Sequence, residues 1–172
     1  DNKIEARHRN LFDVLNAQKY TVDYFQREYS WGEKHIEELV TDLTSAFLNE
    51  YTVGDSREQG ENYNNYYLGP FVVSSKDGKR SIIDGQQRLT TLQYVLASIR
   101  LALRATDLSN LEPLISSCLK NSNEDTMQNK EVERFKLWPT FRDQTHFIQS
   151  FNVENTVAVH IRRIREKIEI NP

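Results

Sequence analysis

The chain is poor in the residues that build disulfide frameworks and metal sites. It has one cysteine, Cys118, in 172 residues, which excludes an internal disulfide framework and a zinc site made of several cysteines. The four histidines show no metal-ligand spacing among themselves. No Gly-x-x-x-x-Gly-Lys loop is present, so a P-loop enzyme is excluded. The sequence also contains no signal peptide and no apolar run of membrane length. We therefore expect a soluble, cytoplasmic protein without a membrane partner.

The chain also lacks an excess of positive charge, because its formal net charge is −3 and its pI is about 5.9. Proteins that coat nucleic acid need many Lys and Arg to neutralise phosphates, so the chain as a whole does not fit that class. The length suits one domain, or one domain and the start of a second. The chain does not begin with Met and ends on a periodic helical pattern. We expect an N-terminal piece of a longer protein, with a core at residues 1–105 and a helical extension at residues 106–172.

Two local patterns predict the centre of the fold. Leu89 to Leu103 is apolar at helical spacing and almost all round, which is typical of a buried helix. Asp77-Gly78 separates two β-rich runs, residues 66–75 and 80–83, and supplies the positive φ angles that a tight hairpin turn needs. The hairpin side chains that we expect in the core are Leu68, Phe71 and Val73.

Weaker patterns predict the elements on either side. A helical stripe from Ile4 to Leu15 precedes a strand at residues 19–25, and Ser30-Trp31-Gly32-Glu33 fits a capping box that opens a helix reaching Phe47. Residues 50–65 are polar and aperiodic, so we expect a surface loop open to disorder. The later patterns predict a helix at 111–119, a connector at 121–130, a strand at 134–138, a helix from Pro139 to Ile148 and a last helix from Val157 to Ile168. The fold class that results is α+β, a small mixed sheet with a helical layer that is richer toward the C-terminus.

Two segments each end a β-run, open a helix and carry a Gln-Arg pair, namely residues 25–31 and residues 84–88. Two arginines that face one pocket can hold an anion with paired hydrogen bonds. The first turn of a buried helix adds unpaired N–H groups and the positive end of its dipole, so it can hold a phosphate. The opposing interpretation is an ordinary strand-to-helix turn, with Arg27 and Arg88 in surface ion pairs.

The polar residues of the second segment can serve in more than one way. Asp84 can bind a divalent cation, or it can fix an arginine. Gln86 and Gln87 both donate and accept hydrogen bonds, which suits contacts to a sugar or base and the orientation of an attacking water. Gly85 lets the backbone take a positive φ or approach a ligand closely.

A longer pattern makes these short motifs more specific. The chain resembles the N-terminal domain of GmrSD-type modification-dependent restriction enzymes, domain-of-unknown-function family 262, which has a ParB/sulfiredoxin-like core. The residues that carry the resemblance are Phe25-Gln26-Arg27-Glu28-Tyr29-Ser30-Trp31, Tyr67-Leu68-Gly69 and Ile83-Asp84-Gly85-Gln86-Gln87-Arg88-Leu89-Thr90-Thr91-Leu92. A weaker likeness extends it through Lys136-Leu137-Trp138-Pro139-Thr140, Asp143 and Phe147. Asp23 and Pro70 depart from the family pattern, in which Pro and a small polar residue are usual, but we expect neither to touch the phosphate contacts.

The resemblance implies a nucleotide-binding core at residues 1–105 that binds and hydrolyses a nucleoside triphosphate with Mg²⁺ or another divalent cation. It implies catalytic roles for Asp84, Gln87 and Arg88, with Asp84 also as the metal ligand. It implies nucleotide binding by Gln26, Arg27, Tyr29, Gly85, Gln86, Thr90 and Thr91. It further implies a regulatory domain of a phage-defence endonuclease, with DNA as a partner of the full-length protein and the nuclease in a separate C-terminal domain. A homo-oligomer is a further partner that the sequence leaves open.

Alternatives remain at several residues and for the function. Tyr29 can stack a base or pack in the core, whereas we assign Trp31 to packing. A basic cluster can track a DNA backbone or form a solvated helix face, and its members are His160, Arg162, Arg163, Arg165 and Lys167. The rival functions are a nucleotide or modified-DNA sensor without turnover, and a DNA-docking or oligomerisation module that ignores nucleotides.

Overall fold

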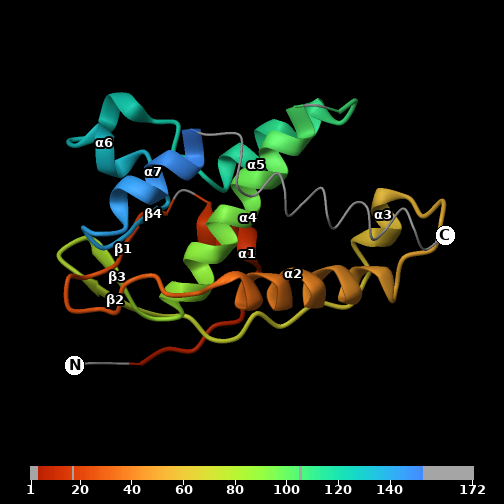
Figure 1. The fold of residues 1–172 in the computed structure, drawn as a ribbon, viewed down its shortest axis with the longest axis horizontal. Coiled ribbons are helices and arrows are strands. Elements are labelled where there is room, and N and C mark those ends of the chain that lie inside the picture. The colour runs from red at the N-terminus through yellow and green to blue at the C-terminus, as the bar shows by residue number, and fades with distance from the viewer. Residues whose placement is uncertain (1–3, 17, 105, 153–172) are drawn as a thin grey trace.

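The computed structural model describes residues 4–16, 18–104 and 106–152. It has the α+β architecture that the sequence predicts, with a small mixed sheet at one end and helices packed against it (Figure 1). The longest elements are α2, Glu33–Leu48, and α4, Gln86–Arg104. The strands are β1 (Tyr20–Thr21), β2 (Val72–Lys76), β3 (Lys79–Asp84) and β4 (Leu137–Trp138). The shorter helices are α1 (Leu11–Leu15), α3 (Arg57–Gly60), α5 (Glu112–Ser117), α6 (Lys130–Glu133) and α7 (Gln144–Asn152).

The four strands lie in the order β2-β3-β1-β4. β1 runs parallel to both of its neighbours, with Thr21 opposite Ser81 of β3 and Tyr20 opposite Leu137 of β4. β1 is shorter than the strand predicted at residues 19–25, because the chain turns soon after it, and the Gln26 amide donates to the Asp23 carbonyl at 2.9 Å. The parallel strands bring the turns that follow β1 and β3 to the same edge of the sheet.

The hairpin of β2 and β3 confirms the prediction made from Asp77-Gly78. Both turn residues have positive φ, 51° for Asp77 and 76° for Gly78, as a two-residue turn of this kind needs. The prediction for its side chains was wrong in part, since Val73 is exposed and the buried residue is Ile82. The hairpin forms the outer side of the sheet, so most of its side chains face solvent.

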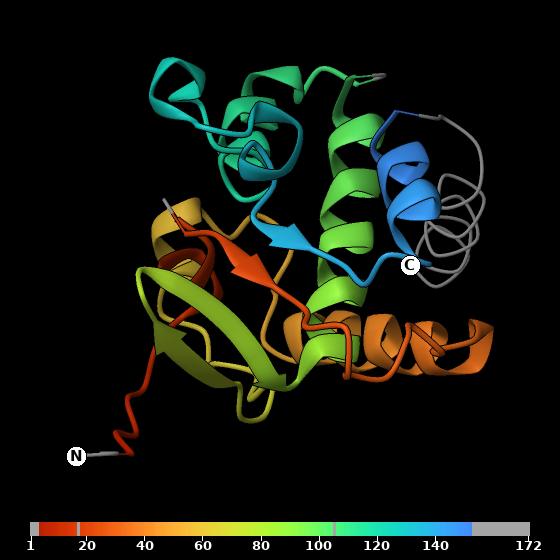
Figure 2. The same ribbon diagram turned by 90° about the vertical axis from the view of Figure 1, so that its left-hand side faces the viewer.

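Helix α4 confirms the predicted buried helix and crosses the middle of the molecule, with α7 beside it (Figure 2). Its first three turns are buried on nearly every side, and polar residues such as Gln93 are buried with the apolar ones. The core mixes side chains from both halves of the chain, so residues before and after position 105 share one cluster. Its members are Leu15, Tyr20, Ile82, Leu89, Tyr94, Ala97, Cys118, Leu119, Phe135, Leu137 and Phe147.

Several predicted boundaries were wrong for reasons that the structure shows. Helix α1 does not reach Ile4, whose side chain is 97% exposed. Residues 30–33 do not form a capping box, because α2 begins at Glu33 after Gly32, which has no side-chain cap. The predicted loop at residues 50–65 contains α3, which opens on a capping box of Ser56 and Gln59.

The C-terminal predictions were confirmed in part. Strand β4 lies within the predicted 134–138, and α5 within the predicted 111–119. Helix α7 begins at Gln144 and not at Pro139, because residues 140–143 form a turn. The predicted helix from Val157 to Ile168 and the basic cluster of His160, Arg162, Arg163, Arg165 and Lys167 lie outside the described residues.

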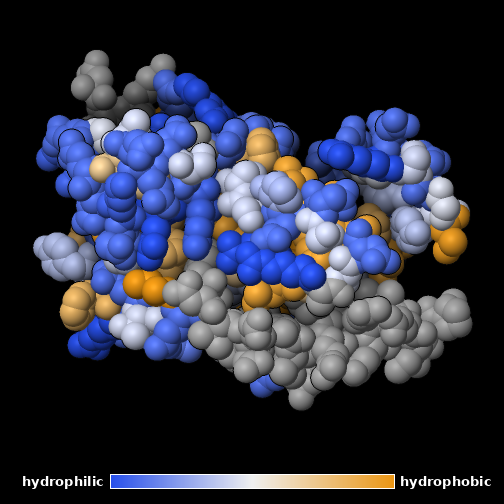
Figure 3. All heavy atoms as spheres, turned by 90° about the horizontal axis from the view of Figure 1, so that it is seen from above, coloured by the Kyte–Doolittle hydropathy of each residue, from blue (hydrophilic) through white to orange (hydrophobic). Residues whose placement is uncertain are grey.

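The surface over the C-terminal helices is mostly hydrophilic, and the hydrophobic atoms in this view form small groups (Figure 3). Helices α5, α6 and α7 lie on this side of the sheet (Figure 1). In the part of the chain that the structure describes, no helix combines the length and the apolar character needed to cross a membrane.

Candidate functional site

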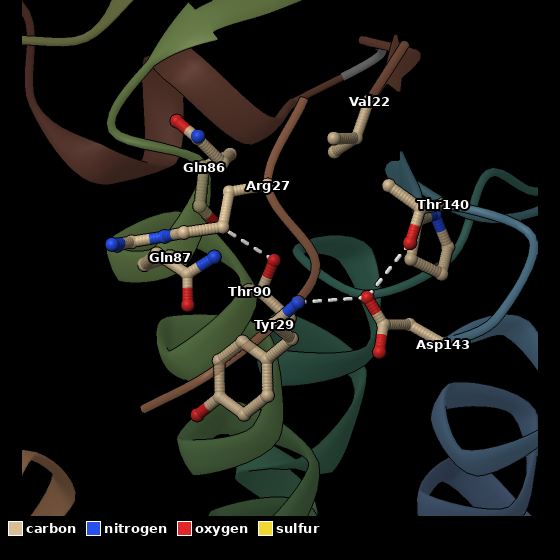
Figure 4. A pocket seen from close by; sticks show the side chains of 9 residues that line it. Val22, Arg27, Tyr29, Gln86, Gln87, Thr90, Thr140 and Asp143 are labelled. Carbon is tan, nitrogen blue, oxygen red and sulfur yellow. Dashed lines mark hydrogen bonds between the residues drawn. The ribbon is translucent and has the colours of Figure 1, made fainter. Parts of the chain in front are cut away.

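A shallow pocket lies where the first turn of α4 meets the segment after β1 and the turn before α7 (Figure 4). The empty space at this place is about 210 Å³, a volume that includes open solvent. The side chains that line it are Val22, Arg27, Tyr29, Gln86, Gln87, Thr90, Pro139, Thr140 and Asp143. The fold therefore brings together residues from both Gln-Arg segments, as the sequence predicts, and adds a third segment that the prediction of the site did not include.

Gln87 ties the two Gln-Arg segments together. Its Oε1 accepts a hydrogen bond from the Ser30 amide at 2.8 Å, and its Nε2 donates to the Glu28 carbonyl at 2.8 Å. The side chain is only 8% exposed. Both functional groups of the amide thus hold the backbone of residues 28–30 against α4. This geometry makes Gln87 a clamp between the two segments, and its catalytic role in orienting water stays a prediction.

Asp143 is a second clamp on the same segment. Its Oδ2 accepts hydrogen bonds from the Tyr29 amide and from the Thr140 hydroxyl, both at 2.8 Å (Figure 4). The Asp143 carbonyl also accepts from the Phe147 amide in the first turn of α7. The resemblance included Thr140 and Asp143, but we did not place them at the site. The sequence did contain a signal for them. Thr140 and Asp143 stand three residues apart at the start of a helical pattern, which is typical of an N-terminal cap.

Tyr29 is held in the wall of the pocket by its own side chain. Its hydroxyl lies 2.9 Å from the Thr91 hydroxyl, and its ring meets the ring of Tyr94 edge to face at 5.4 Å. Burial raises the pKa of Tyr29 above its ordinary value. The ring therefore packs against the core, which favours the packing alternative over base stacking.

The two threonines of α4 direct their hydroxyls back into the helix. Thr90 donates to the Gln86 carbonyl at 2.7 Å, and Thr91 donates to the Gln87 carbonyl at 2.8 Å. Such bonds to the carbonyl four residues earlier are common for threonine in helices. Thr90 lines the pocket, whereas Thr91 supports it from behind through Tyr29.

Arg27 and Gln86 are the polar groups of the pocket with the fewest internal bonds. The Gln86 amide makes one long contact, 3.4 Å, to Gln26 Oε1. Arg27 is exposed, and none of the described carboxylates forms an ion pair with it. Its neighbour Glu28 instead pairs with Arg142 at 3.0 Å. The guanidinium of Arg27 points away from Asp143 (Figure 4), so its donors face solvent beside the start of α4.

Arg88 lies on another side of the same turn. Its Nη1 donates to the Pro70 carbonyl at 3.1 Å, and its guanidinium lies 5.6 Å from the centre of the Phe71 ring. Gly69 has φ 88°, which favours glycine, and a Cβ there would come within 2.9 Å of the Arg88 Nη1 atom, so the guanidinium would have to shift to admit another residue. Arg88 does not line the pocket, and the expectation that Pro70 touches none of the proposed phosphate contacts was wrong, since its carbonyl binds Arg88.

Asp84 and Gly85 form the turn that starts α4. Asp84 is exposed, and its Oδ1 accepts from the Gly85 amide at 2.8 Å. Gly85 has φ 88°, and a Cβ there would lie 2.6 Å from Phe71 Cδ1. The Gly85 carbonyl accepts from the Leu89 amide, the first such bond of the helix, so the amides of residues 86–88 have no partner within α4. Among the described residues, no group of three or more His, Cys, Asp or Glu could hold a metal ion, so any cation here would depend on Asp84 and on the ligand.

Comparison with known proteins identifies the family. No curated protein matches the chain. Residues 10–170, nearly the whole chain, match the family described as GmrSD restriction endonuclease, N-terminal domain. The match covers α4, the segment after β1 and the turn before α7, which together form the pocket. The chain therefore belongs to the family of GmrSD restriction endonuclease N-terminal domains.

Proposed function

We propose that this domain binds a nucleoside triphosphate with a divalent cation at the start of α4 and so regulates DNA cleavage by a restriction endonuclease. The observation that carries the proposal is the exposed Arg27 guanidinium, without a described carboxylate partner, beside the first turn of a buried helix. A cation placed next to unpaired helix amides is a typical arrangement for binding phosphate. The family supports the second half of the proposal, because its members are parts of restriction endonucleases.

The pocket is too shallow to enclose a whole nucleotide. Its empty space of about 210 Å³ includes open solvent, so the volume that it encloses is far below the roughly 300–1,000 Å³ of ordinary small-molecule sites. The phosphates would lie against Arg27, Gln86 and the first amides of α4, and the nucleoside would extend outside. The clamps at Gln87 and Asp143 hold the Arg27 segment in place before the ligand arrives, which lowers the entropy cost of binding.

Hydrolysis of the bound triphosphate would depend on Asp84 and Gln86. Mg²⁺ in phosphate sites is commonly held by one or two carboxylates together with the phosphates themselves. The exposed carboxylate of Asp84 next to the start of α4 fits that minimal requirement. Gln86, with a single long contact, is freer than Gln87 to orient an attacking water.

The test is a titration of the domain with nucleoside triphosphate and Mg²⁺. Binding to the native state raises the melting temperature, since a ligand at a hundredfold excess over Kd stabilises by about 2.7 kcal/mol. The variant Arg27→Ala should lose most of this shift and keep the stability of the unliganded domain. Arg57→Ala is the matched control, because Arg57 is exposed, belongs to α3 and has only a surface ion pair with Glu61.

Two results would contradict the proposal. Wild-type domain that shows no shift at millimolar nucleotide does not have the site. Arg27→Ala and Arg57→Ala variants that bind equally well would show that the site lies elsewhere.

A further inference from the structure

Two aromatic side chains of the turn after β1 stand in solvent. Tyr24 is 94% exposed and Phe25 is 64% exposed. Their rings meet edge to face, with centres 5.6 Å apart and an angle of 85° between the planes. Large aromatic side chains gain most of their stabilisation from burial, so an exposed pair contributes little to this fold. The pair is therefore available to a ligand.

The chain places this pair within two residues of the wall of the pocket. Tyr24 is two residues from Val22, and Phe25 is two residues from Arg27, and both of these line the pocket. Two residues span at most about 7 Å, so neither aromatic backbone position is farther than that from the wall of the pocket. The turn itself is fixed, because the Gln26 amide donates to the Asp23 carbonyl at 2.9 Å.

The sheet also holds the start of this turn. The Asp23 carboxylate accepts a hydrogen bond from the Ser81 hydroxyl of β3 at 3.1 Å. The Val22 amide donates to the Trp138 carbonyl of β4 at 2.9 Å. Both strands beside β1 thus fix the backbone just before Tyr24, so the residue that carries the exposed ring is held next to the sheet.

We propose that Tyr24 is the platform on which the base of the nucleotide stacks, with Phe25 holding the Tyr24 ring from its edge. This inference rests on the proposed function and extends it by assigning the part of the ligand that the pocket has no room for. Tyr29 does not compete for this role, because its hydroxyl and ring are engaged with Thr91 and Tyr94. Stacking on an aromatic ring accepts any base, so Tyr24 raises affinity for nucleotides of every base.

The test compares two ligands that differ in the base, namely a nucleoside triphosphate and inorganic tripolyphosphate, each with Mg²⁺ in calorimetric titrations. Tyr24→Ala should weaken binding of the nucleoside triphosphate by about 5-fold to 150-fold, the range measured for loss of one stacked base. It should leave binding of tripolyphosphate unchanged. Tyr24→Phe keeps the ring and should keep wild-type affinity for both ligands.

Tyr51→Ala is the control for loss of an exposed aromatic ring. Tyr51 follows the far end of α2, a helix of 16 residues, so it lies roughly 24 Å from the end of α2 that is next to the pocket. This variant should bind both ligands as the wild type does.

The outcomes separate this inference from the proposed function. Wild-type protein that binds neither ligand refutes both. Wild-type protein that binds both ligands, together with a Tyr24→Ala variant of unchanged affinity, refutes the stacking role alone. Equal losses for the two ligands also refute it, because tripolyphosphate has no base. An unchanged affinity combined with loss of a dimer in sedimentation would instead make the pair an interface between copies of the chain.

Discussion

The clamp formed by Gln87 gives the sharpest test of how the pocket is built. Gln87→Leu keeps a side chain of similar size and removes the two hydrogen bonds to the backbone of Glu28 and Ser30. A hydrogen bond of this kind contributes about 0.5–1.5 kcal/mol net, so the free energy of unfolding should fall by about 1–3 kcal/mol. Urea unfolding measures this change directly, and its slope shows whether the denatured state has changed as well.

Hydrogen exchange adds a local measurement to the global one. The acceptor of the Ser30 amide is Gln87 Oε1, so this amide should exchange about 5-fold to 150-fold faster in Gln87→Leu if its opening is governed by the lost bonds. Gln86→Leu is the matched control, because Gln86 is the adjacent glutamine and makes only one contact of 3.4 Å. That variant should change the unfolding free energy by less than about 0.5 kcal/mol.

The reasoning is refuted by one combination of results. If the two leucine variants lose the same stability, and if the Ser30 amide exchanges at the wild-type rate in Gln87→Leu, the side chain of Gln87 does not hold the segment.

Three further predictions concern the turn before α4 and the α6 region. Gly85→Ala should lower the free energy of unfolding, measured in urea, by at least about 1–2 kcal/mol, since φ is 88° and Phe71 is 2.6 Å from the new Cβ. Gly60→Ala is the control and should not lower it in this way, because Gly60 has open space around it and no positive φ. Hydrogen bonds from Lys19 and from two backbone amides lower the pKa of Glu133. The ionised Glu133 carboxylate therefore stabilises the fold above the unfolded pKa near 4.5, and this stabilisation is lost as the pH falls through the lower folded pKa. Glu133→Gln should flatten this acid dependence of the unfolding free energy in denaturant melts between about pH 5.5 and 3. Asp84→Ala should leave the melting temperature nearly unchanged and reduce metal-dependent phosphate release on the order of a hundredfold, whereas normal turnover per folded molecule would remove Asp84 from the chemistry.

The features that the sequence predicted correctly are those set by neighbours along the chain. The apolar spacing of α4 and the turn at Asp77-Gly78 each depend on a few adjacent residues. The capping box predicted at residues 30–33 also rested on adjacent residues of the right types, but that prediction was wrong. The Ser30 amide is bound instead by Gln87, a residue far along the chain, and Gly32 before the helix is extended.

The composition of the site was partly predictable for the same reason. Successive residues of a helix are about 100° apart, so Gln86, Gln87 and Thr90 share a face and Arg88 points elsewhere. In the structure the first three line the pocket, and Arg88 instead binds the Pro70 carbonyl. A helical projection would have separated Arg88 from Arg27 in advance. The role of Asp143 could not be derived in this way, because it depends on β4 lying next to β1.

The position of β1 sets the order in which this fold can be completed during synthesis. Its two residues pair with β3 on one side and with β4 on the other, and both partners are made much later. At about 5–20 residues per second, the ribosome needs roughly 6–25 s to go from Thr21 to Trp138. Until then β1 has an open edge, which is a template for pairing with another chain. Fragments that stop before β4 should therefore aggregate, even though they contain both Gln-Arg segments.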